Sequence, residues 1–268
     1  MQPPIMLCKT WDHKRLPPPL YASYKLDGVR GLYDPAKMVI VSRKYHEIPA
    51  VQHIADKFAE AKVDTFIDME LVVPDTDFHT SSGIIRRKYA TQYDVSAYAL
   101  DIYLPNEASF YSRQLHLEHL VKVIGSDYIQ FLYSRRCETI DAINAEYKEA
   151  LDKGYEGLVL KRPYHLYRNS RSYDWCRYVP SVQVDGVVKQ IMEGEGKYAA
   201  SVGAVIVEFE FGETATVGVF KGITDSERLQ WAANPDLIVG KTVIVEYKET
   251  TPDGRLRQPR IKGIRYDK

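Results

Sequence analysis

The chain has 268 residues, of which 45% are hydrophobic and 27% are charged, a composition typical of globular proteins. Its 36 Lys and Arg residues balance its 36 Asp and Glu residues, so net charge favours no partner and a nucleic-acid surface would need local clustering of basic residues. The three cysteines are widely spaced, without a C-x-x-C pair. This pattern excludes a disulfide framework and a zinc site, and it indicates a reducing compartment.

The amino-terminal residues lack the charged and apolar regions of a signal peptide. No apolar stretch approaches the roughly 20 residues that a membrane span needs. We therefore expect a cytoplasmic protein without a membrane partner. The length fits one large domain or two smaller ones.

A cluster of polar residues follows a proline-rich lead-in, residues 1–20, in which we expect little regular structure. Lys25, Asp27, Gly28 and Arg30 lie close together where two strands are predicted to meet. The spacing suits a lysine that attacks a phosphate. Lys25 would be the nucleophile, Asp27 would orient or deprotonate it, and Arg30 would hold phosphate or sugar oxygens. Gly28 would let the backbone turn beside a ligand.

The state of the Lys25 amine decides whether it can attack. A free lysine has a pKa of ~10.4, so a cationic neighbourhood or a metal must lower that pKa to supply the neutral amine. The alternative is a surface lysine beside an ordinary Asp-Gly turn. These few residues leave both interpretations open.

The next strong β pattern, residues 66–73, places two carboxylates on one face. Asp68 and Glu70 alternate with apolar residues. Two carboxylates on a buried strand are costly unless they meet cations or a metal. The alternative is that both face solvent. A polar loop is predicted at residues 81–83, before the basic pair Arg86 and Arg87.

Three helices are expected in the first two thirds of the chain, at residues 53–61, 112–124 and 140–152. For the second helix we expect Leu115, Leu120 and Val123 to face the core. Gly154 is a candidate C-cap residue for the third helix.

A second charged and apolar run follows at Glu156 to Lys161. Its apolar centre predicts a buried strand. The charged residue at each end suggests that both ends of this strand open onto a polar cleft. Residues 161–178 then interleave basic and aromatic side chains, which suits contact with phosphates and bases. Arg171 and Arg177 belong to this stretch.

From Pro180 onwards the pattern changes to short strands and turns, with one helix at residues 224–233 opened by a capping box of Thr224 and Glu227. Five strands and one helix in this length fit an OB-fold. Arg257, Arg260 and Lys262 form the best basic patch here. We therefore expect two domains, residues 1–180 and 181–268.

Five motifs, in this order, resemble those of the covalent nucleotidyltransferases, the superfamily of DNA ligases, RNA ligases and mRNA capping enzymes. They are Lys25 to Arg30, Ser42-Arg43, Ile67 to Leu71, Glu156 to Lys161 and Arg265 to Lys268.

The carboxy-terminal run is most similar to that of small phage and bacterial ATP-dependent DNA ligases. The resemblance implies an α+β fold: an ATP-grasp-like nucleotidyltransferase domain of antiparallel sheets with helices, then an all-β OB-fold domain.

The resemblance also implies a function. Lys25 would take AMP from ATP, pass it to the 5′-phosphate of nicked duplex DNA, and so allow the 3′-hydroxyl to seal the nick in DNA replication, repair and recombination. It implies ATP as cofactor and Mg²⁺ or Mn²⁺, with Glu70 and Glu156 suited to hold the metal or a ribose hydroxyl. It also implies a monomer in the cytoplasm, or the host cytoplasm if a phage encodes it. The implied nucleotide-binding residues are Tyr24, Lys25, Arg30, Arg43, Glu70, Tyr98, Leu100, Glu156, Lys161, Arg177, Arg265 and Lys268. The implied DNA-binding residues are Arg43, Arg86, Arg87, Arg171, Arg257, Arg260 and Lys262.

The sequence departs from the family pattern at two places. Arg177 and Val179 stand where the family has two phosphate-binding lysines, and valine cannot replace a lysine. Leu100 stands where the family has an adenine-stacking aromatic residue, and Tyr98 on the same strand face is the candidate replacement. An RNA ligase or a capping guanylyltransferase is the alternative enzyme, and a degenerate nucleic-acid-binding module is the alternative without catalysis.

Overall fold

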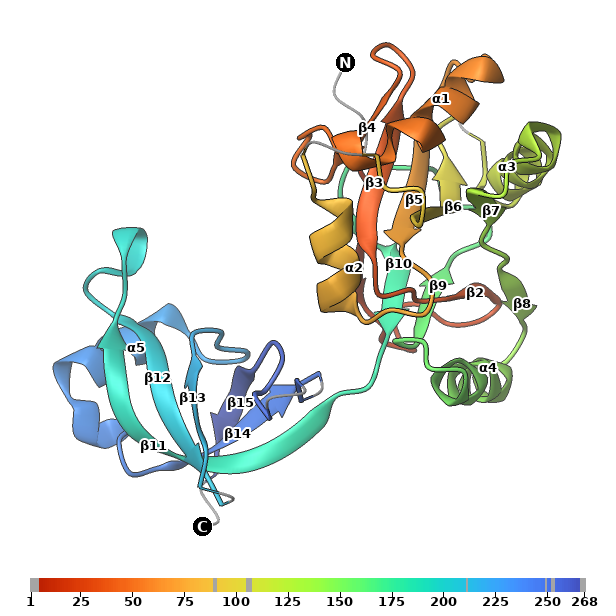
Figure 1. Cartoon of the computed structure of the whole chain (residues 1–268). Coiled ribbons are helices and arrows are strands. Elements are labelled where there is room, and N and C mark those ends of the chain that lie inside the picture. The colour runs from red at the N-terminus through yellow and green to blue at the C-terminus, as the bar shows by residue number, and fades with distance from the viewer. Residues whose placement is uncertain are drawn as a thin grey trace. The chain divides into compact units, whose positions relative to one another are not determined.

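The computed structural model describes the chain except residues 1–4, 89–90, 105–107, 211, 249, 252–253 and 266–268. The chain divides into two compact units, residues 1–179 and 180–268. Figure 1 shows that the first unit mixes strands and helices and that the second is built mainly of strands. In the described part of the chain, no helix is both long and apolar enough to cross a membrane.

The first unit contains two five-stranded sheets. The first sheet has the strand order β1 (Leu7–Thr10), β10 (Arg171–Tyr178), β9 (Leu158–Lys161), β2 (Leu20–Tyr24) and β8 (Arg135–Cys137). The second has the order β4 (Val39–Ser42), β3 (Val29–Asp34), β5 (Ile67–Val72), β6 (Ser96–Ile102) and β7 (Ile129–Phe131). Two pairs, β1 with β10 and β6 with β7, are parallel. The sheets are therefore mixed and not wholly antiparallel as expected.

Helices cover these sheets and close their cores (Figure 1). They are η1 (Pro49–Val51), α1 (Gln52–Glu60), α2 (Phe78–Ile85), α3 (Phe110–Ile124) and α4 (Ile140–Asp152). The larger core joins α1 and α3 to the second sheet, and a smaller one joins α4 to the first sheet. Gly154 follows α4 with a φ of +82°, which confirms it as the glycine that ends this helix.

Two elements differ from the expected ones. The lead-in contains β1, which gains order by pairing with β10 far along the chain. The predicted polar loop at residues 81–83 is part of α2, whose N-cap residue Asp77 accepts hydrogen bonds from the amides of His79 and Thr80. Ser81 is buried there because its hydroxyl accepts a hydrogen bond from the Val73 amide at 3.0 Å. Its polarity therefore marked an internal hydrogen bond and not a solvent-exposed loop.

The buried face of α3 also differs from the expected one. Leu115 and Val123 are 50% and 65% exposed, so the expectation that they face the core is wrong. The residues that α3 buries are Phe110, Arg113, Gln114, Leu117 and Val121. These positions follow the helical i, i+3, i+4 spacing, but two of them carry polar side chains.

The second unit is a single five-stranded sheet that curls toward closure. Its elements are β11 (Val182–Glu193), η2 (Gly196–Tyr198), β12 (Val202–Phe209), β13 (Thr214–Val217), α5 (Asp225–Ala233), η3 (Pro235–Leu237), β14 (Thr242–Tyr247) and β15 (Arg260–Ile264). The strand order is β13-β12-β11-β14-β15. The segment after β13 reaches β15, because the Ile261 amide donates to the Val219 carbonyl at 2.8 Å and the Lys221 amide donates to the Ile261 carbonyl at 2.7 Å. This closure gives the small barrel that the strand count predicts.

The helix of this unit begins as predicted. Thr224 and Glu227 form a complete capping box at the start of α5. Trp231, on the same helix, is 5% exposed and packs into the barrel core. The cap therefore fixes the start of a helix that covers one part of the barrel.

Candidate active site

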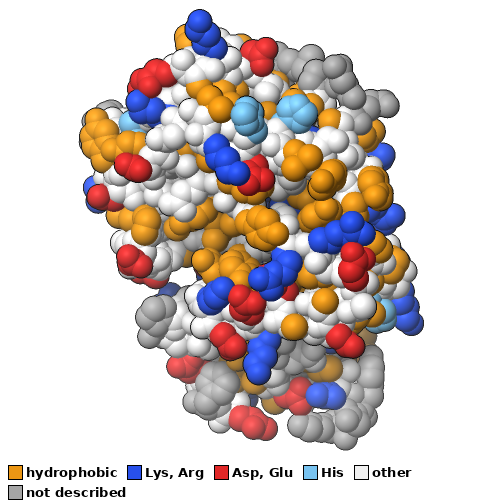
Figure 2. Space-filling view, turned by 90° about the vertical axis from the view of Figure 1, so that its right-hand side faces the viewer, with side chains coloured by type: hydrophobic (Ala, Val, Ile, Leu, Met, Phe, Trp, Pro, Cys, Tyr) orange, Lys and Arg blue, Asp and Glu red, His pale blue; other side chains and the backbone are white. Residues whose placement is uncertain are grey.

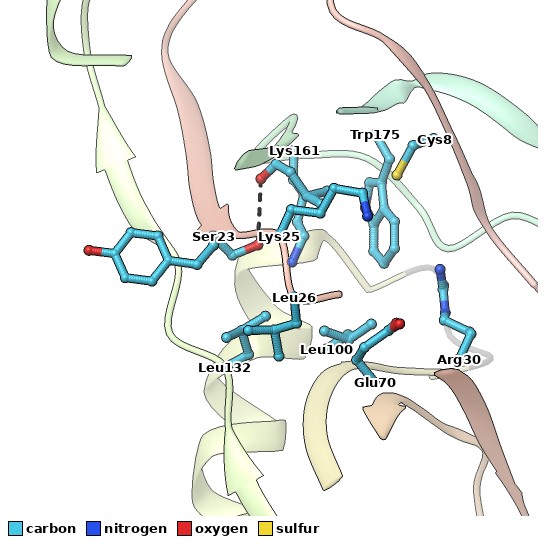
Figure 3. A pocket seen from close by; sticks show the side chains of 12 residues that line it. Cys8, Ser23, Lys25, Leu26, Arg30, Glu70, Leu100, Leu132, Lys161 and Trp175 are labelled. Atoms are coloured by element: carbon cyan, nitrogen blue, oxygen red, sulfur yellow. Dashed lines mark hydrogen bonds between the residues drawn. The ribbon is translucent and has the colours of Figure 1, made fainter. Parts of the chain in front are cut away.

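A pocket in the first unit is lined by residues from both of its sheets (Figure 3). The lining residues are Cys8, Ser23, Tyr24, Lys25, Leu26, Arg30, Glu70, Leu100, Leu132, Val159, Lys161 and Trp175. The chain passes from the first sheet to the second between β2 and β3, and Lys25 lies in this crossing. The motif of residues 25–30 therefore brings groups of both sheets to one place.

Backbone hydrogen bonds and two glycines fix this crossing. The Lys25 amide donates to the Gly157 carbonyl at 2.8 Å, and the Glu156 amide donates to the Lys25 carbonyl at 3.1 Å. A Cβ atom on Gly28 would lie 2.3 Å from the Leu71 carbonyl oxygen, and Gly157 has a φ of +133°. Gly28 therefore lets β5 approach closely, a different reason from the expected turn beside a ligand.

The side chain of Lys25 is largely enclosed and meets Glu156. Its Nζ forms an ion pair with the Glu156 carboxylate, whose side chain is 8% exposed. Burial lowers the pKa of Lys25 from its ordinary value, while the negative charges of Glu70 and Asp27 act in the opposite direction. Loss of hydration thus favours the neutral amine that a nucleophile needs, and the positive charge of Arg177 acts in the same direction, as expected of a cationic neighbour.

Arg30 and Asp68 form a buried pair at the edge of the pocket. Both oxygens of Asp68 accept from the Arg30 guanidinium, which also donates to the Met6 carbonyl at 3.1 Å. The Tyr167 hydroxyl donates to Asp68 at 2.6 Å. Asp68 is 3% exposed, so the solvent-facing alternative is wrong for this carboxylate and the expected cation is Arg30.

Glu70, two residues along the same strand, has no such close partner among the hydrogen bonds described. Burial raises the pKa of Glu70 to about 7, although the positive charges of Arg30 and Lys25 lower it. A carboxyl group with a raised pKa lacks full compensation for its charge. An additional cation at this place would therefore stabilise its ionised form.

Lys161 carries a buried nitrogen that has no hydrogen-bond partner in the described part of the chain, as do both ring nitrogens of His53. The residue is 1% exposed, and its Nζ lies 5.0 Å from the ring centroids of both Phe110 and Trp175. Burial lowers the pKa of Lys161 to about 8. A buried ammonium without a hydrogen-bond acceptor fits an anionic ligand such as a phosphate group.

The other part of the pocket is apolar. Leu26, Leu100, Leu132 and Val159 line it. The ladder between β5 and β6 pairs Met69 with Ala99 and Asp68 with Asp101, which leaves Leu100 as the extra residue of a β-bulge. Leu100 lies in the pocket lining and Tyr98 does not. In Figure 3, Leu100 and Trp175 lie on opposite sides of the labelled pocket.

A buried polar network, which sequence reasoning missed, lies behind Trp175. The Trp175 indole donates to His165 Nε2 at 2.8 Å, and His165 Nδ1 lies 2.5 Å from the Arg162 carbonyl. Arg113 donates to both oxygens of Asp101 at 2.8 and 2.9 Å. No local pattern in the sequence marks His165 or Arg113, because the hydrogen bond that joins them spans 52 positions of the chain.

This network predicts a pH dependence of folding. Burial lowers the pKa of His165 from 6.5 to about 4. Between these two values the unfolded chain binds a proton that the folded chain does not, so stability falls as the pH drops from 6.5 toward 4. The pKa difference corresponds to about 3 kcal/mol. Urea unfolding at pH 7 and pH 4.5 gives the fall in the free energy of unfolding on acidification. This fall should be smaller for His165→Gln than for the wild type by about this amount. The exposed His119→Gln variant is the control, and the same acid sensitivity in wild type and His165→Gln would refute the prediction.

The remaining predicted site residues lie outside this pocket. Arg43 and Arg171 line a second depression together with Tyr45 and Asn169, and Arg86 and Arg87 are exposed at the end of α2. Arg177 is on β10 and does not line the pocket. Four predicted site residues lie in the second unit: Arg257, Arg260, Lys262 and Arg265. The Arg265 guanidinium pairs with the Asp185 carboxylate at 3.2 Å. Lys268 lies outside the described residues.

The surface charges show no broad single-sign region on the side of the molecule seen in Figure 2. Basic and acidic side chains are interspersed there, with hydrophobic side chains between them. This agrees with the balance of charges in the sequence. A nucleic-acid surface on this side would have to use individual basic groups and not a continuous patch.

Comparison with known families gives this geometry a context. A family model described as the ATP dependent DNA ligase domain matches residues 6–178. The chain belongs to the ATP-dependent DNA ligase family. A second model, the DNA ligase OB-like domain, matches residues 193–265. The fold is thus a nucleotidyltransferase domain followed by an OB-like domain, and the protein is an ATP-dependent DNA ligase by family.

Relatives of similar length support this membership. The DNA ligase of Enterobacteria phage T3 is 25% identical, over 92% of this chain and 89% of its own. The DNA ligase of Escherichia phage T7 is 24% identical, over 90% of this chain and 88% of its own. In both cases the match extends over most of the relative.

Solved structures share the fold. A Lig E DNA ligase, from a study of DNA binding with a minimal scaffold, has a TM-score of 0.81 at 22% identity and covers 99% of this chain and 100% of that chain. The bacteriophage T7 ligase in complex with ATP has a TM-score of 0.58 at 20% identity, with 98% of each chain covered.

Proposed function

We propose that this protein seals nicks in duplex DNA through an AMP group carried on Lys25. In the first step the Lys25 amine, having lost a proton, bonds to the α-phosphorus of ATP, and the bond to the β-phosphate breaks to release pyrophosphate. AMP then passes to the 5′-phosphate at a nick. The 3′-hydroxyl attacks this activated phosphate, loses its proton and displaces AMP.

The buried ammonium of Lys161 is the observation that carries this proposal. It lines the same pocket as Lys25 and lacks a hydrogen-bond partner among the described residues. An α-phosphate within reach of the Lys25 amine would supply the missing negative charge. The hydrogen bonds to Asp68 already hold the Arg30 guanidinium in place. Arg30 would therefore act as a fixed positive group at the pocket edge.

The apolar side of the pocket suits the adenine base. Leu26, Leu100, Leu132 and Val159 offer aliphatic contact surface, and Tyr24, which stacks on Tyr155 at 4.6 Å, borders it. The base would therefore rest on leucine and valine side chains, and not on Tyr98, the candidate replacement for the family's aromatic residue.

The carboxylates of Glu70 and Glu156 would hold a Mg²⁺ or Mn²⁺ ion. Among the residues the structure describes, no three His, Cys, Asp or Glu side chains gather in a metal-binding group. Two carboxylates, with the remaining ligands from water and phosphate, are the usual arrangement for Mg²⁺. The ion would neutralise charge on the phosphates.

The DNA would be held outside the pocket by separate basic groups. The exposed Arg43, Arg86, Arg87 and Arg171 are the candidates in the first unit, and Arg257, Arg260 and Lys262 are the candidates in the second. Arg265 and Lys268 would assist the release of pyrophosphate. The protein would act as a monomer in the cytoplasm, that of the host if a phage encodes it.

Labelled nucleotides test this function directly. Incubation with ATP labelled at the α-phosphate should leave label on the protein, whereas ATP labelled at the γ-phosphate should not. The labelled protein should then seal a nicked DNA duplex. Labelling by GTP alone, or sealing of RNA but not DNA, would assign the chain to capping or RNA joining and contradict the proposal.

A further inference from the structure

The ammonium group of Lys161 is enclosed by two aromatic rings. Phe110 comes from α3 and Trp175 from β10, and each ring centroid lies 5.0 Å from Lys161 Nζ. No hydrogen bond to a described residue fixes this nitrogen, so it is held by its contacts with the two rings and by the charges of Asp101 and Asp68. The positions of these two rings therefore contribute to the placement of the Lys161 ammonium.

His165 contacts both rings. Its Nε2 accepts the hydrogen bond from the Trp175 indole at 2.8 Å, and its imidazole stacks on Phe110 with centroids 5.4 Å apart and an interplanar angle of 14°. The Nδ1 position faces the Arg162 carbonyl at 2.5 Å. That carbonyl can only accept, so Nδ1 carries the proton, and the Nε2 lone pair accepts from Trp175 and faces an Arg113 nitrogen at 3.2 Å.

The rest of the network fixes His165 itself. Arg113 donates to the His165 carbonyl at 2.9 Å while its other nitrogens hold Asp101. His165, Arg113 and Asp101 are all buried. The histidine is thus tied to the core of the second sheet, although it lies on a segment without regular secondary structure between β9 and β10.

We propose that His165 is a positioning residue for nucleotidyl transfer. It fixes the Trp175 ring relative to Phe110, and the two rings hold the Lys161 ammonium where the phosphates of the nucleotide arrive. A long lysine side chain that is already ordered loses less freedom when the reaction begins. This inference rests on the proposed function, but it assigns His165 a role that neither the motifs nor the pocket lining gives it.

Matched variants test this role through the rate of self-adenylation. His165→Leu removes the acceptor for the Trp175 indole, and we expect the limiting rate at saturating ATP to fall about tenfold, as for loss of one buried hydrogen bond. His165→Gln can place an amide oxygen near the former Nε2, so it should keep a rate within about threefold of wild type. The ATP concentration at half-maximal rate should change by less than about threefold in both.

A second pair of variants separates positioning from general stability. Trp175→Phe keeps a ring beside Lys161 but removes the indole donor. In this background, His165→Leu should cause a smaller further loss than it does in the wild type, because its bond to the indole no longer exists and only the Nε2 contact with Arg113 at 3.2 Å and the Nδ1 contact with Arg162 remain to be lost. Rates are compared per folded molecule, with the folded fraction measured from urea unfolding of each variant.

The outcomes are distinguishable. A wild-type rate for His165→Leu, equal losses for His165→Gln and His165→Leu, or additive losses with Trp175→Phe would each overturn the role of His165 while leaving the proposed function standing. A failure of the wild type to take label from α-labelled ATP would overturn the proposed function and this inference together.

Discussion

Replacing Lys25 by alanine is expected to remove both self-adenylation and nick sealing, a loss of more than about 1000-fold, because the amine that bonds to the α-phosphorus is lost. Lys25→Arg should be equally inactive, since a guanidinium keeps the positive charge but supplies no neutral nitrogen near pH 7. The measurement is transfer of α-labelled AMP to the protein, followed by sealing of a nicked duplex.

A matched lysine shows whether the loss is specific. Lys153 also lies near the motif, because its Nζ lies 3.0 Å from the hydroxyl of Tyr24, the residue before Lys25, but it does not line the pocket. Lys153→Ala should therefore keep adenylation within about twofold of wild type.

A bypass substrate sharpens this test. A nick that already carries AMP on its 5′-phosphate needs no amine, so Lys25→Ala should still join it at a measurable rate. Label on the Lys25→Ala protein, or an inactive Lys153→Ala variant, would remove Lys25 from the proposed role.

The parts of the site that sequence predicts are those held by contiguous residues. Lys25 to Arg30 and Glu156 to Lys161 each span six positions, so their local order already carries the chemistry. The structure brings Lys25, Glu70 and Lys161 into one pocket because the chain crosses between two sheets after β2. The Lys25–Glu156 contact adds long-range information, since it joins residues 131 positions apart.

Sequence periodicity fails where the backbone or a buried charge interrupts it. The β-bulge at Leu100 breaks the alternation that would give Tyr98 and Leu100 the same environment. On α3, burial of Arg113 and Gln114 turns Leu115 outward. Apolar spacing cannot reveal this rotation, because a buried arginine is stable only with a partner that the local sequence does not show.

The lining of the pocket includes three cationic side chains, Lys25, Arg30 and Lys161. Lys25 is paired with Glu156 and Arg30 with Asp68, so Lys161 is the pocket cation most available to a phosphate. The aromatic rings around Lys161 are therefore important for the proposed reaction. Holding this one ammonium in place would partly offset the small number of unpaired cations in the pocket. Through these rings, His165 could affect the reaction rate although it performs no chemical step itself.

Replacement of Arg113 by leucine is expected to destabilise the protein by about 3–5 kcal/mol, because it leaves the Asp101 carboxylate buried without its partner. The side chains of both residues are 0% exposed. Urea unfolding should show this as a large fall in the midpoint of the first unit's transition. Lys122→Leu is the matched control on α3: its surface pair with Glu118 should contribute only about 0.5 kcal/mol.

The double variant Arg113→Leu with Asp101→Leu separates the charge from the packing. If the loss comes from an uncompensated carboxylate, removing that carboxylate should restore much of the stability, since apolar pairs of similar volume replace buried ion pairs at little cost. Losses that simply add would mean that both side chains matter chiefly for their other contacts. For Arg113 those contacts are the carbonyls of Ala108 and His165, and an additive result would make this backbone anchoring, and not the ion pair, the reason for burying a charge behind the pocket.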